Sequence, residues 1–460
     1  MRILIITHFF PPGHIGGTET LTAAIAESLN QHHDVQVLCA ENWDTAPSHE
    51  IQATDDHYQN IPVRRLHFNW QKAPDVFGYL YNNPEVERYL DQYLAELQPD
   101  IVHITSCYSL SASVITAAHK AGIPIVLTAT DFWFLCARNT LLQRDGSLCS
   151  GPESAWKCAK CNLAQSKAYH WPRAVLPETI VKTGLMSIAP FPVITRQRGF
   201  RGLHGNWEGR FEYLREALQK VDQIVTASSF LRSLLIDYGV EESRIEFSAY
   251  GLDTRWAEGF QTKTPSDKLR FGFIGQLIPI KGPDILIRAF RELDPSVPAE
   301  LLIYGDSNKN PEYGQQLAQL AEGDPRIKFM GTFPYDEIGR VLTAMDVMVA
   351  PSTWYDFPLV IPSAFATNTP VIATDMAGMN ELVRDEVDGL LFPRHDVAAL
   401  ARQLQRLVDD PTLVPCLQQG IQPVKTIEQM MDFYLEIYTE LKGRAFDVSP
   451  PQKPVNVSKV

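Results

Sequence analysis

Short apolar runs alternate with helical patterns twice along this chain. The runs are rich in β-branched residues, and the stretches between them carry apolar residues every three to four positions. Alternation of this kind is typical of parallel strands covered by helices on both faces. The pattern therefore predicts two doubly wound α/β domains in succession. The expected strands are 3–7, 35–38, 63–66, 101–105, 125–128 and 224–227, then 271–274, 301–304, 327–330, 347–350, 371–373 and 389–392.

Helical patterns are expected near 18–30, 85–97, 110–121, 208–220, 397–408 and 425–442. A polar, proline-bearing stretch without periodicity, Gln261-Thr-Lys-Thr-Pro-Ser-Asp-Lys268, separates the two halves.

These patterns set the predicted domain boundaries. We place an N-terminal domain at 1–258, a linker at 259–268 and a C-terminal domain at 269–424. A helix at 425–445 is expected to cross back to the first domain, and a proline-rich tail at 446–460 is expected to be disordered. Open α/β sheets bind ligands at the carboxyl ends of their strands, so we expect a cleft between the domains.

Composition and charge limit the classes of partner that this chain could bind. The 460 residues carry 41 Lys and Arg against 54 Asp and Glu, a net charge of -13. This balance argues against a broad nucleic-acid surface, although a local basic patch such as 194–203 leaves peripheral membrane contact open. Only four apolar residues follow Arg2, too few for a signal peptide, so we expect a cytoplasmic protein whose first strand is buried.

Glycine-bearing turns follow the first strand of each half. Gly16 and Gly17 precede a helix whose free N–H groups suit a phosphate, although turn geometry alone would also explain the glycines. In the second half, Phe273-Ile-Gly-Gln-Leu-Ile-Pro-Ile-Lys-Gly282 places Lys281 in the equivalent turn. A solvated loop lysine is the plain alternative there.

The segment Pro351-Ser-Thr-Trp-Tyr-Asp-Phe-Pro-Leu-Val, followed by Ala364-Phe-Ala, Pro370-Val-Ile and Gly378-Met-Asn-Glu381, resembles the donor site of family 4 nucleotide-sugar glycosyltransferases. The resemblance covers the chain to about residue 445 and implies the GT-B fold, two Rossmann-like domains facing a central cleft. It further implies donor contacts by Gly16, Gly17, Gly275, Gln276, Lys281, Gly305, Asp306, Ser363, Gly378 and Glu381.

Catalytic roles come from the same resemblance. Val126-Leu-Thr-Ala-Thr-Asp-Phe-Trp-Phe-Leu-Cys-Ala-Arg138 resembles the run that lines the cleft beside the reacting sugar, with Trp133 as a possible stacking face or as core packing. The implied catalytic residues are Thr130, Asp131, Lys281 and Asp356. Three positions depart from the family pattern, because Thr130, Gln276 and Ser363 replace an expected His, Arg and Glu.

Four cysteines cluster after this run, at positions 136, 149, 158 and 161. Four thiolates including a Cys-x2-Cys pair suit a tetrahedral structural zinc, which we favour over disulfides in a cytoplasmic protein. An iron–sulfur cluster and free thiols stay open. A similar insert occurs in a subset of the resembling transferases. The predicted metal ligands are Cys136, Cys149, Cys158 and Cys161.

The resemblance implies transfer of a sugar from a nucleotide diphosphate sugar to a saccharide or lipid-linked acceptor, with retention, in surface polysaccharide or glycoconjugate synthesis. The partners would be the nucleotide sugar and the acceptor, without nucleic acid. The three departures each remove a charge or a titratable group from one cleft. The alternative is therefore a catalytically impaired GT-B protein that binds a glycan or an active transferase.

Overall fold

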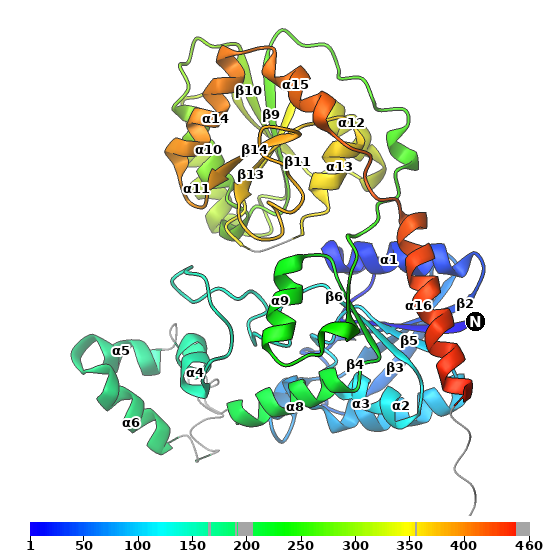
Figure 1. Cartoon of the computed structure of the whole chain (residues 1–460). Coiled ribbons are helices and arrows are strands. Elements are labelled where there is room, and N and C mark those ends of the chain that lie inside the picture. The colour runs from blue at the N-terminus through cyan, green and yellow to red at the C-terminus, as the bar shows by residue number, and fades with distance from the viewer. Residues whose placement is uncertain (164–166, 189–190, 192–205, 355–356, 448–460) are drawn as a thin grey trace, which may run out of the picture.

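The computed structural model describes residues 1–163, 167–188, 191, 206–354 and 357–447. Two α/β units lie one above the other, and the last helix returns to the unit that contains the N-terminus (Figure 1). The prediction of two Rossmann-like domains in a GT-B arrangement is confirmed. The predicted disordered tail overlaps the end of this helix, and its residues 448–460 lie outside the described part of the chain.

The N-terminal sheet has eight strands in the order β3-β4-β2-β1-β5-β6-β7-β8. Seven of its strands run parallel, whereas β3 pairs antiparallel with β4. The bounds are β1 (Arg2–Thr7), β2 (Asp34–Asn42), β3 (Gln52–Tyr58), β4 (Ile61–His67), β5 (Ile101–Ile104), β6 (Ile125–Ala129), β7 (Gln223–Thr226) and β8 (Ile245–Phe247).

The antiparallel strand at this edge was not among the strands expected from the sequence. Strand β3 is polar and largely exposed, so it carries no apolar run by which the sequence could reveal it. Gln59 and Asn60, with φ of 47° and 67°, form the two-residue turn to β4. Positive φ at both central positions is typical of the tight hairpin turns that match strand twist.

Alternate strand residues of the N-terminal sheet pack against different helices. Ile3 and Ile5 face a cluster formed with α1 (Gly17–Asn30) and α16 (Ile427–Asp447). Leu4 and Ile6 face the opposite cluster. Its helices are α2 (Pro84–Leu97), α3 (Ser113–Lys120), α8 (Trp207–Gln219) and α9 (Ser229–Asp237). The strand period of two therefore buries both faces, as a doubly wound sheet requires.

The C-terminal sheet is parallel throughout, in the order β11-β10-β9-β12-β13-β14. Its strands are β9 (Leu269–Ile274), β10 (Ala299–Tyr304), β11 (Ile327–Gly331), β12 (Val347–Ala350), β13 (Val371–Asp375) and β14 (Gly389–Pro393). All six were expected from the sequence. The helices are α10 (Pro283–Arg291), α11 (Pro311–Ala321), α12 (Ile338–Thr343), α13 (Val360–Ala366), α14 (Val397–Asp409) and α15 (Leu413–Gly420).

The chain crosses between the domains twice, and the two crossings pair with each other. The backbone N–H of Leu252 donates to the Lys425 carbonyl at 2.9 Å, and the N–H of Ile427 donates to the Leu252 carbonyl at 3.0 Å. A Cβ at Gly251 would lie 2.3 Å from the Thr426 carbonyl oxygen, so this close approach requires glycine. The predicted linker 259–268 follows the first crossing, and the partly buried Lys263 amine within it donates to the Leu342 carbonyl at 3.1 Å.

Helix α16 is anchored to the N-terminal core by a buried polar network. Tyr438 and Tyr434 are at most 1 % exposed. The Tyr438 hydroxyl lies 2.6 Å from Nδ1 of His103, whose Nε2 lies 2.7 Å from the Thr128 hydroxyl. The Tyr434 hydroxyl is 2.6 Å from that same Thr128 oxygen. Because every member is buried and paired, the network fixes where the returning helix sits.

We predict that this network makes the protein acid-sensitive. Burial lowers the pKa of His103 to about 3, whereas an unfolded histidine has a pKa of about 6.5. Between these values the unfolded state binds the extra proton, so stability is complete above about pH 6.5 and falls as pH drops towards 3. In urea titrations between pH 6 and 4, His103→Gln should reduce the pH slope of the unfolding free energy by about 1.4 kcal/mol per pH unit.

The matched control is His119→Gln, at an exposed position on α3. It should leave the slope at the wild-type value. An unchanged slope in His103→Gln would contradict a neutral buried imidazole.

Candidate functional site

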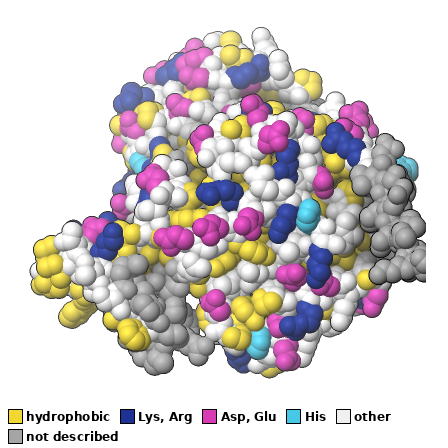
Figure 2. Space-filling model, turned by 60° about the horizontal axis from the view of Figure 1, so that its bottom comes forward, with side chains coloured by type: hydrophobic (Ala, Val, Ile, Leu, Met, Phe, Trp, Pro, Cys, Tyr) yellow, Lys and Arg dark blue, Asp and Glu magenta, His cyan; other side chains and the backbone are white. Residues whose placement is uncertain are grey.

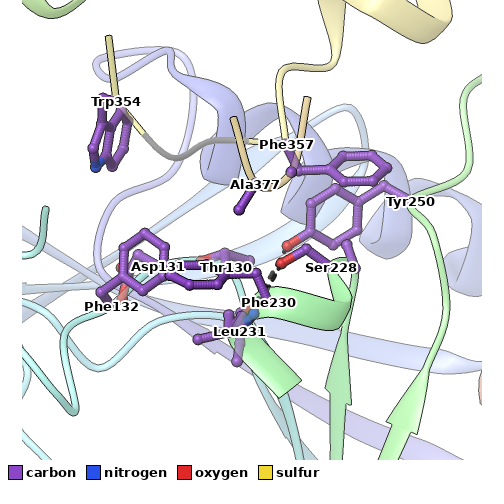
Figure 3. Close-up of a pocket in the computed structure, with 13 residues that line it drawn as sticks. Thr130, Asp131, Phe132, Ser228, Phe230, Leu231, Tyr250, Trp354, Phe357 and Ala377 are labelled. Atoms are coloured by element: carbon purple, nitrogen blue, oxygen red, sulfur yellow. Dashed lines mark hydrogen bonds between the residues drawn. The ribbon is translucent and has the colours of Figure 1, made fainter. Parts of the chain in front are cut away.

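The carboxyl ends of strands from both sheets meet at a pocket between the domains (Figure 3). From the N-terminal domain come the loops after β6 and β7 and the first crossing. The C-terminal domain contributes the loops after β12 and β13. The lining residues are Ala129, Thr130, Asp131, Phe132, Ala227, Ser228, Phe230, Leu231, Tyr250, Trp354, Phe357, Ala377 and Gly378. This is where open α/β sheets place their ligands.

Thr130 and Asp131, two of the predicted catalytic residues, lie together in this pocket. The Thr130 hydroxyl donates to the Thr105 carbonyl at 2.9 Å and accepts from Thr18 at 3.2 Å. Asp131 accepts from the Trp133 backbone N–H at 2.9 Å and from the Asn139 amide at 3.2 Å. Burial raises the pKa of Asp131, against these hydrogen bonds and the charge of His8. Both side chains thus help to hold the loop that shapes the pocket.

Trp133 does not supply the stacking face that the sequence suggested. It is 4 % exposed and packs edge-on against Phe134, with ring centroids 5.0 Å apart. The plain alternative, core packing, is therefore the observed one. The aromatic residues that line the pocket are instead Phe132, Phe230, Tyr250, Trp354 and Phe357.

The glycine turn after β1 begins helix α1 beside the pocket. Gly16 is the N-cap and has no side chain to cap the helix, but the Glu19 carboxylate accepts a hydrogen bond from its own backbone N–H in the first turn. The carboxylate of Glu19 folds back, so that a Cβ at Gly16 would lie 2.6 Å from it. Glu19 also pairs with His8, whose Nε2 lies 3.2 Å away. Burial raises the pKa of Glu19, but the hydrogen bond and charge of His8 outweigh this and hold the pKa below its usual value.

The predicted donor loop after β9 places Lys281 beside the pocket. The Lys281 amine lies 5.4 Å from the centre of the Trp354 ring. Gly282 follows with φ of 69°, and a Cβ there would lie 2.1 Å from the Pro351 carbonyl oxygen. Only glycine allows this approach of the donor loop to the end of β12. Gln276 is exposed at the start of the same loop.

The neighbouring donor-side turns are built on backbone contacts. Gly275 and Gly305 come so close that a Cβ at Gly305 would lie 2.3 Å from the Gly275 carbonyl oxygen. The Asp306 carboxylate accepts from the Asn308 backbone N–H at 2.8 Å, which stabilises the turn after β10. These glycines bring the two loops together at the carboxyl edge of the sheet.

Two further residues predicted at the donor site, Ser363 and Asp356, do not contribute a described polar group to the pocket. Ser363 is 3 % exposed on α13, and its hydroxyl donates to the Leu359 carbonyl at 2.8 Å. The polar group is therefore engaged within its own helix. Asp356 and the whole basic segment 194–203 lie outside the described residues, and their predicted roles stay predictions.

Glu381 connects the two domains. Its carboxylate accepts from the backbone N–H groups of Ser229 and Phe230, at 2.6 Å and 3.4 Å. These groups form the first turn of α9, so a C-terminal-domain anion occupies the positive end of an N-terminal-domain helix. Gly378, with φ of 87°, lines the pocket one turn earlier.

The insert after β6 also reaches the other domain. The indole N–H of Trp354 donates to the Thr140 carbonyl at 2.8 Å, and Arg394 donates to the Gly146 carbonyl at 2.5 Å. On the other side of the pocket, Tyr250 and Phe357 meet edge to face with centroids 5.0 Å apart. The structure thus shows the cleft bridged on several sides.

The zinc prediction is not supported. Among the described residues, which include all four cysteines of the insert, no group of three or more His, Cys, Asp or Glu is arranged to hold a metal ion. The thiols lie near one another, since Cys136, Cys149 and Cys161 add to the effect of burial in raising the pKa of Cys158. Two of them have other partners, because Cys161 accepts from Arg138 at 3.7 Å and Cys149 donates to the Gly151 carbonyl at 3.7 Å. Burial raises the pKa of Cys158 to about 12, and Cys136 packs at the edge of the core.

Sequence reasoning missed several residues of the site. His8, Glu19, Ser228 and Tyr250 belong to no motif that the sequence singled out. The Trp354 ring was quoted only as part of a segment. A histidine directly after a buried strand, at the edge where ligands bind, was the one available signal for His8.

Comparisons with known proteins fit this geometry. Residues 16–251, half of the chain, match the family described as glycosyl transferase 4-like domain. The chain belongs to this glycosyltransferase family. Residues 268–410 of this glycosyltransferase also match the model described as glycosyl transferases group 1.

Relatives in sequence are named D-inositol 3-phosphate glycosyltransferase. The protein from Salinispora tropica is 29 % identical over 262 residues, which cover 50 % of this chain and 54 % of the relative. That from Corynebacterium efficiens is 33 % identical over 202 residues, covering 40 % and 48 %. The chain thus spans about half the length of the curated relatives it matches.

Solved structures show the same fold. HepE from Anabaena in complex with UDP has a TM-score of 0.64 at 18 % identity, covering 96 % of this chain and all of that one. Sucrose-phosphate synthase from Thermosynechococcus elongatus has a TM-score of 0.61 at 17 % identity, covering 95 % and 99 %.

We predict that Glu381→Gln loosens the bridge between the domains. The amide still accepts a hydrogen bond but loses the charge that the α9 N-terminus favours. Amide exchange at Ser229, followed by mass spectrometry, should become about fivefold faster or more. Glu386→Gln is the matched control, because that carboxylate pairs with Arg406 inside the C-terminal domain. Equal exchange rates at Ser229 in both variants would show that the Glu381 charge does not stabilise the contact with α9.

Proposed function

We propose that this glycosyltransferase moves a sugar from a nucleotide diphosphate sugar to a saccharide or lipid-linked acceptor, with retention at the anomeric carbon. The observation that carries the proposal is the pairing of two features at one pocket. Lys281 contacts Trp354 of the lining on the donor side. The start of α1 contacts the lining on the other side, where the Thr18 hydroxyl donates to Thr130.

These features suit a diphosphate. A lysine amine offers a positive charge on a flexible stem, and the free N–H groups of a helix start offer hydrogen bonds to oxyanions. The tight contacts at Gly275, Gly282 and Gly305 leave the backbone close to a ligand at the sheet edge. The family membership supports a nucleotide-sugar donor, as does the UDP named for HepE.

In the proposed reaction the bond between the anomeric carbon and the diphosphate oxygen breaks, and its electron pair leaves with the diphosphate. The acceptor hydroxyl oxygen forms the new bond to the same carbon from the same face. The hydroxyl proton passes to the departing diphosphate oxygen. Lys281 and the α1 start would stabilise the charge that develops on that oxygen, which is electrostatic catalysis by groups already in place.

For the acceptor and the pathway we infer only the chemical class. Sequence relatives carry names that specify an inositol phosphate acceptor. They support a polyol or saccharide hydroxyl as nucleophile in this chain. We propose a role in surface polysaccharide or glycoconjugate synthesis, where saccharide and lipid-linked acceptors are used in succession.

The second candidate is a GT-B protein that binds donor or glycan without turnover. It is favoured by the positions that depart from the family pattern. Gln276 cannot compensate diphosphate charge, Thr130 carries no titratable group, and the Ser363 hydroxyl is engaged within α13. The two candidates differ in turnover rather than in fold.

Calorimetric titration with a panel of nucleoside diphosphates and their sugars, followed by product analysis with simple saccharide acceptors, separates these candidates. Binding with transfer is the expected result. Binding without hydrolysis or transfer would favour the second candidate, and the absence of binding to every member of the panel would refute both donor-site assignments.

Replacing Lys281 by Ala should weaken nucleoside diphosphate binding about tenfold or more, since a charge-assisted contact is lost. Lys268→Ala is the matched control. It removes a lysine at the amino end of the same strand, where the side chain lies 3.9 Å from Glu300. Titration calorimetry should show wild-type affinity for the control; equal affinities for all three proteins would mean that the diphosphate binds elsewhere.

Gln276→Arg tests the missing cation. A guanidinium at this exposed loop position would face the departing diphosphate with a second positive charge. We expect nucleoside diphosphate affinity to rise by about threefold or more, and transfer to accelerate if the wild type transfers. Binding that is weaker than in the wild type would show that the loop does not approach the phosphates.

A further inference from the structure

Three short helices after the cysteine loop form a projection on the side of the N-terminal domain. They are α4 (Ala155–Leu163), α5 (Lys167–Val175) and α6 (Glu178–Ile188), and they extend away from the body of the molecule (Figure 1). Leu163, Tyr169, Val181 and Leu185 form a small core of their own between these helices. One side of the α5–α6 hairpin is therefore buried in this small core.

The opposite side of the hairpin is apolar and faces solvent. Figure 2 shows hydrophobic side chains gathered on this projection. We call the exposed residues the hairpin patch: Trp171 is 74 % exposed, Val175 81 %, Leu176 42 % and Ile180 55 %. Trp171 and Val175 are one helical turn apart on α5, and Leu176 and Ile180 flank the turn into α6. Apolar exposure on this scale marks an interaction surface.

The charge around the hairpin patch is opposite to that of the chain. Residues 154–191 contain five Lys and Arg and a single acidic residue, Glu178, in a protein of net charge -13. That glutamate is already paired, because the Lys160 amine lies 2.8 Å from its carboxylate. Arg173 and Lys182 are exposed on the same two helices as the patch. The sequence continues with Arg196, Arg198 and Arg201 before the next acidic residue, Glu208.

We propose that the hairpin patch docks this protein onto an anionic lipid bilayer. Its aromatic and aliphatic side chains would enter the boundary between headgroups and acyl chains, while Arg173 and Lys182 would contact headgroup phosphates. Apolar burial and attraction to anionic lipid together account for this kind of peripheral binding. Within the described residues no helix has the length and apolarity to cross a bilayer, and surface docking needs none.

A bilayer fits the patch better than a second copy of the chain. The patch lies at the end of a two-helix projection (Figure 1), and such a tip presents little area, whereas a stable dimer buries about 1,200 Å² or more. A small projecting surface can still insert into a bilayer, because lipids rearrange around it. The local excess of basic residues complements anionic headgroups over the whole projection.

The proposal goes beyond sugar transfer, and it is tested without nucleotide sugar. The full-length protein is floated with vesicles of phosphatidylcholine alone or with about 30 % phosphatidylglycerol. We expect binding to the anionic vesicles, weak binding to the neutral ones, and a decrease as salt is raised. Trp171→Ser/Val175→Ser/Ile180→Ser should bind about tenfold less or weaker.

The matched control is Phe329→Ser/Met330→Ser/Val387→Ser. These residues are 40 %, 45 % and 43 % exposed in the C-terminal domain, so the control replaces three exposed apolar side chains elsewhere and should bind as the wild type does. A second variant, Arg173→Glu/Lys182→Glu, changes only exposed charges and should lose binding by a similar factor. Arg402→Glu/Lys309→Glu, exposed in the C-terminal domain, is its control.

Wild-type protein that floats with neither vesicle, or patch variants that float as well as the wild type, would overturn the proposal. Sedimentation velocity provides the remaining distinction. Dimers that the patch variant abolishes, in a protein that ignores vesicles, would assign the patch to self-association and refute lipid docking.

Discussion

The return of α16 to the first domain is the constraint on which the arrangement of the cleft depends. Two buried tyrosines of this helix close a network with His103 and Thr128, which sit on adjacent strands β5 and β6. The two interdomain crossings then pair with each other at Leu252 and Ile427. Since these contacts fix the route of both crossings, the carboxyl ends of the two sheets face one another and the pocket forms between them.

Three charged groups in the described part of the cleft have defined neighbours. The Glu381 carboxylate lies at the start of α9, the Lys281 amine lies against Trp354, and Glu19 pairs with His8. A diphosphate entering this region would meet the Lys281 amine and the start of α1, where the Glu19 carboxylate is paired with His8. The bridging contacts by Glu381, Trp354 and Arg394 would have to yield if the domains open to admit a donor. Such bridges are weak individually, which suits a cleft that opens and closes.

The sequence was sufficient for most of the fold because buried parallel strands are continuous apolar runs. It failed at β3, a polar strand recruited by a hairpin turn, and at β8, which has only three residues. The site was partly predictable. Glycines and Lys281 stand at turns after strands, where chain order alone places them at the ligand edge. The pairing of Glu381 with α9 and the burial of Trp133 are tertiary facts without a local signal.

The cysteine insert is a second place where a residue pattern did not predict the structure. Spacing alone suggested one tetrahedral site, but spacing does not fix where side chains point. Among the described residues the thiols form no group that could hold a metal ion, and the loop that carries them uses backbone carbonyls at Thr140 and Gly146 to reach the second domain. Its connection to the cleft is thus through main-chain groups that a residue pattern cannot reveal.

The central claim is that the donor binds between the two sheet edges. Its most direct test is amide exchange with and without a saturating nucleoside diphosphate sugar. The account predicts slower exchange in the loop 275–282, at the start of α1 and in the loop 376–381, with little change at the outer edges of either sheet. Protection confined to other surfaces, or no protection despite measured binding, would contradict it.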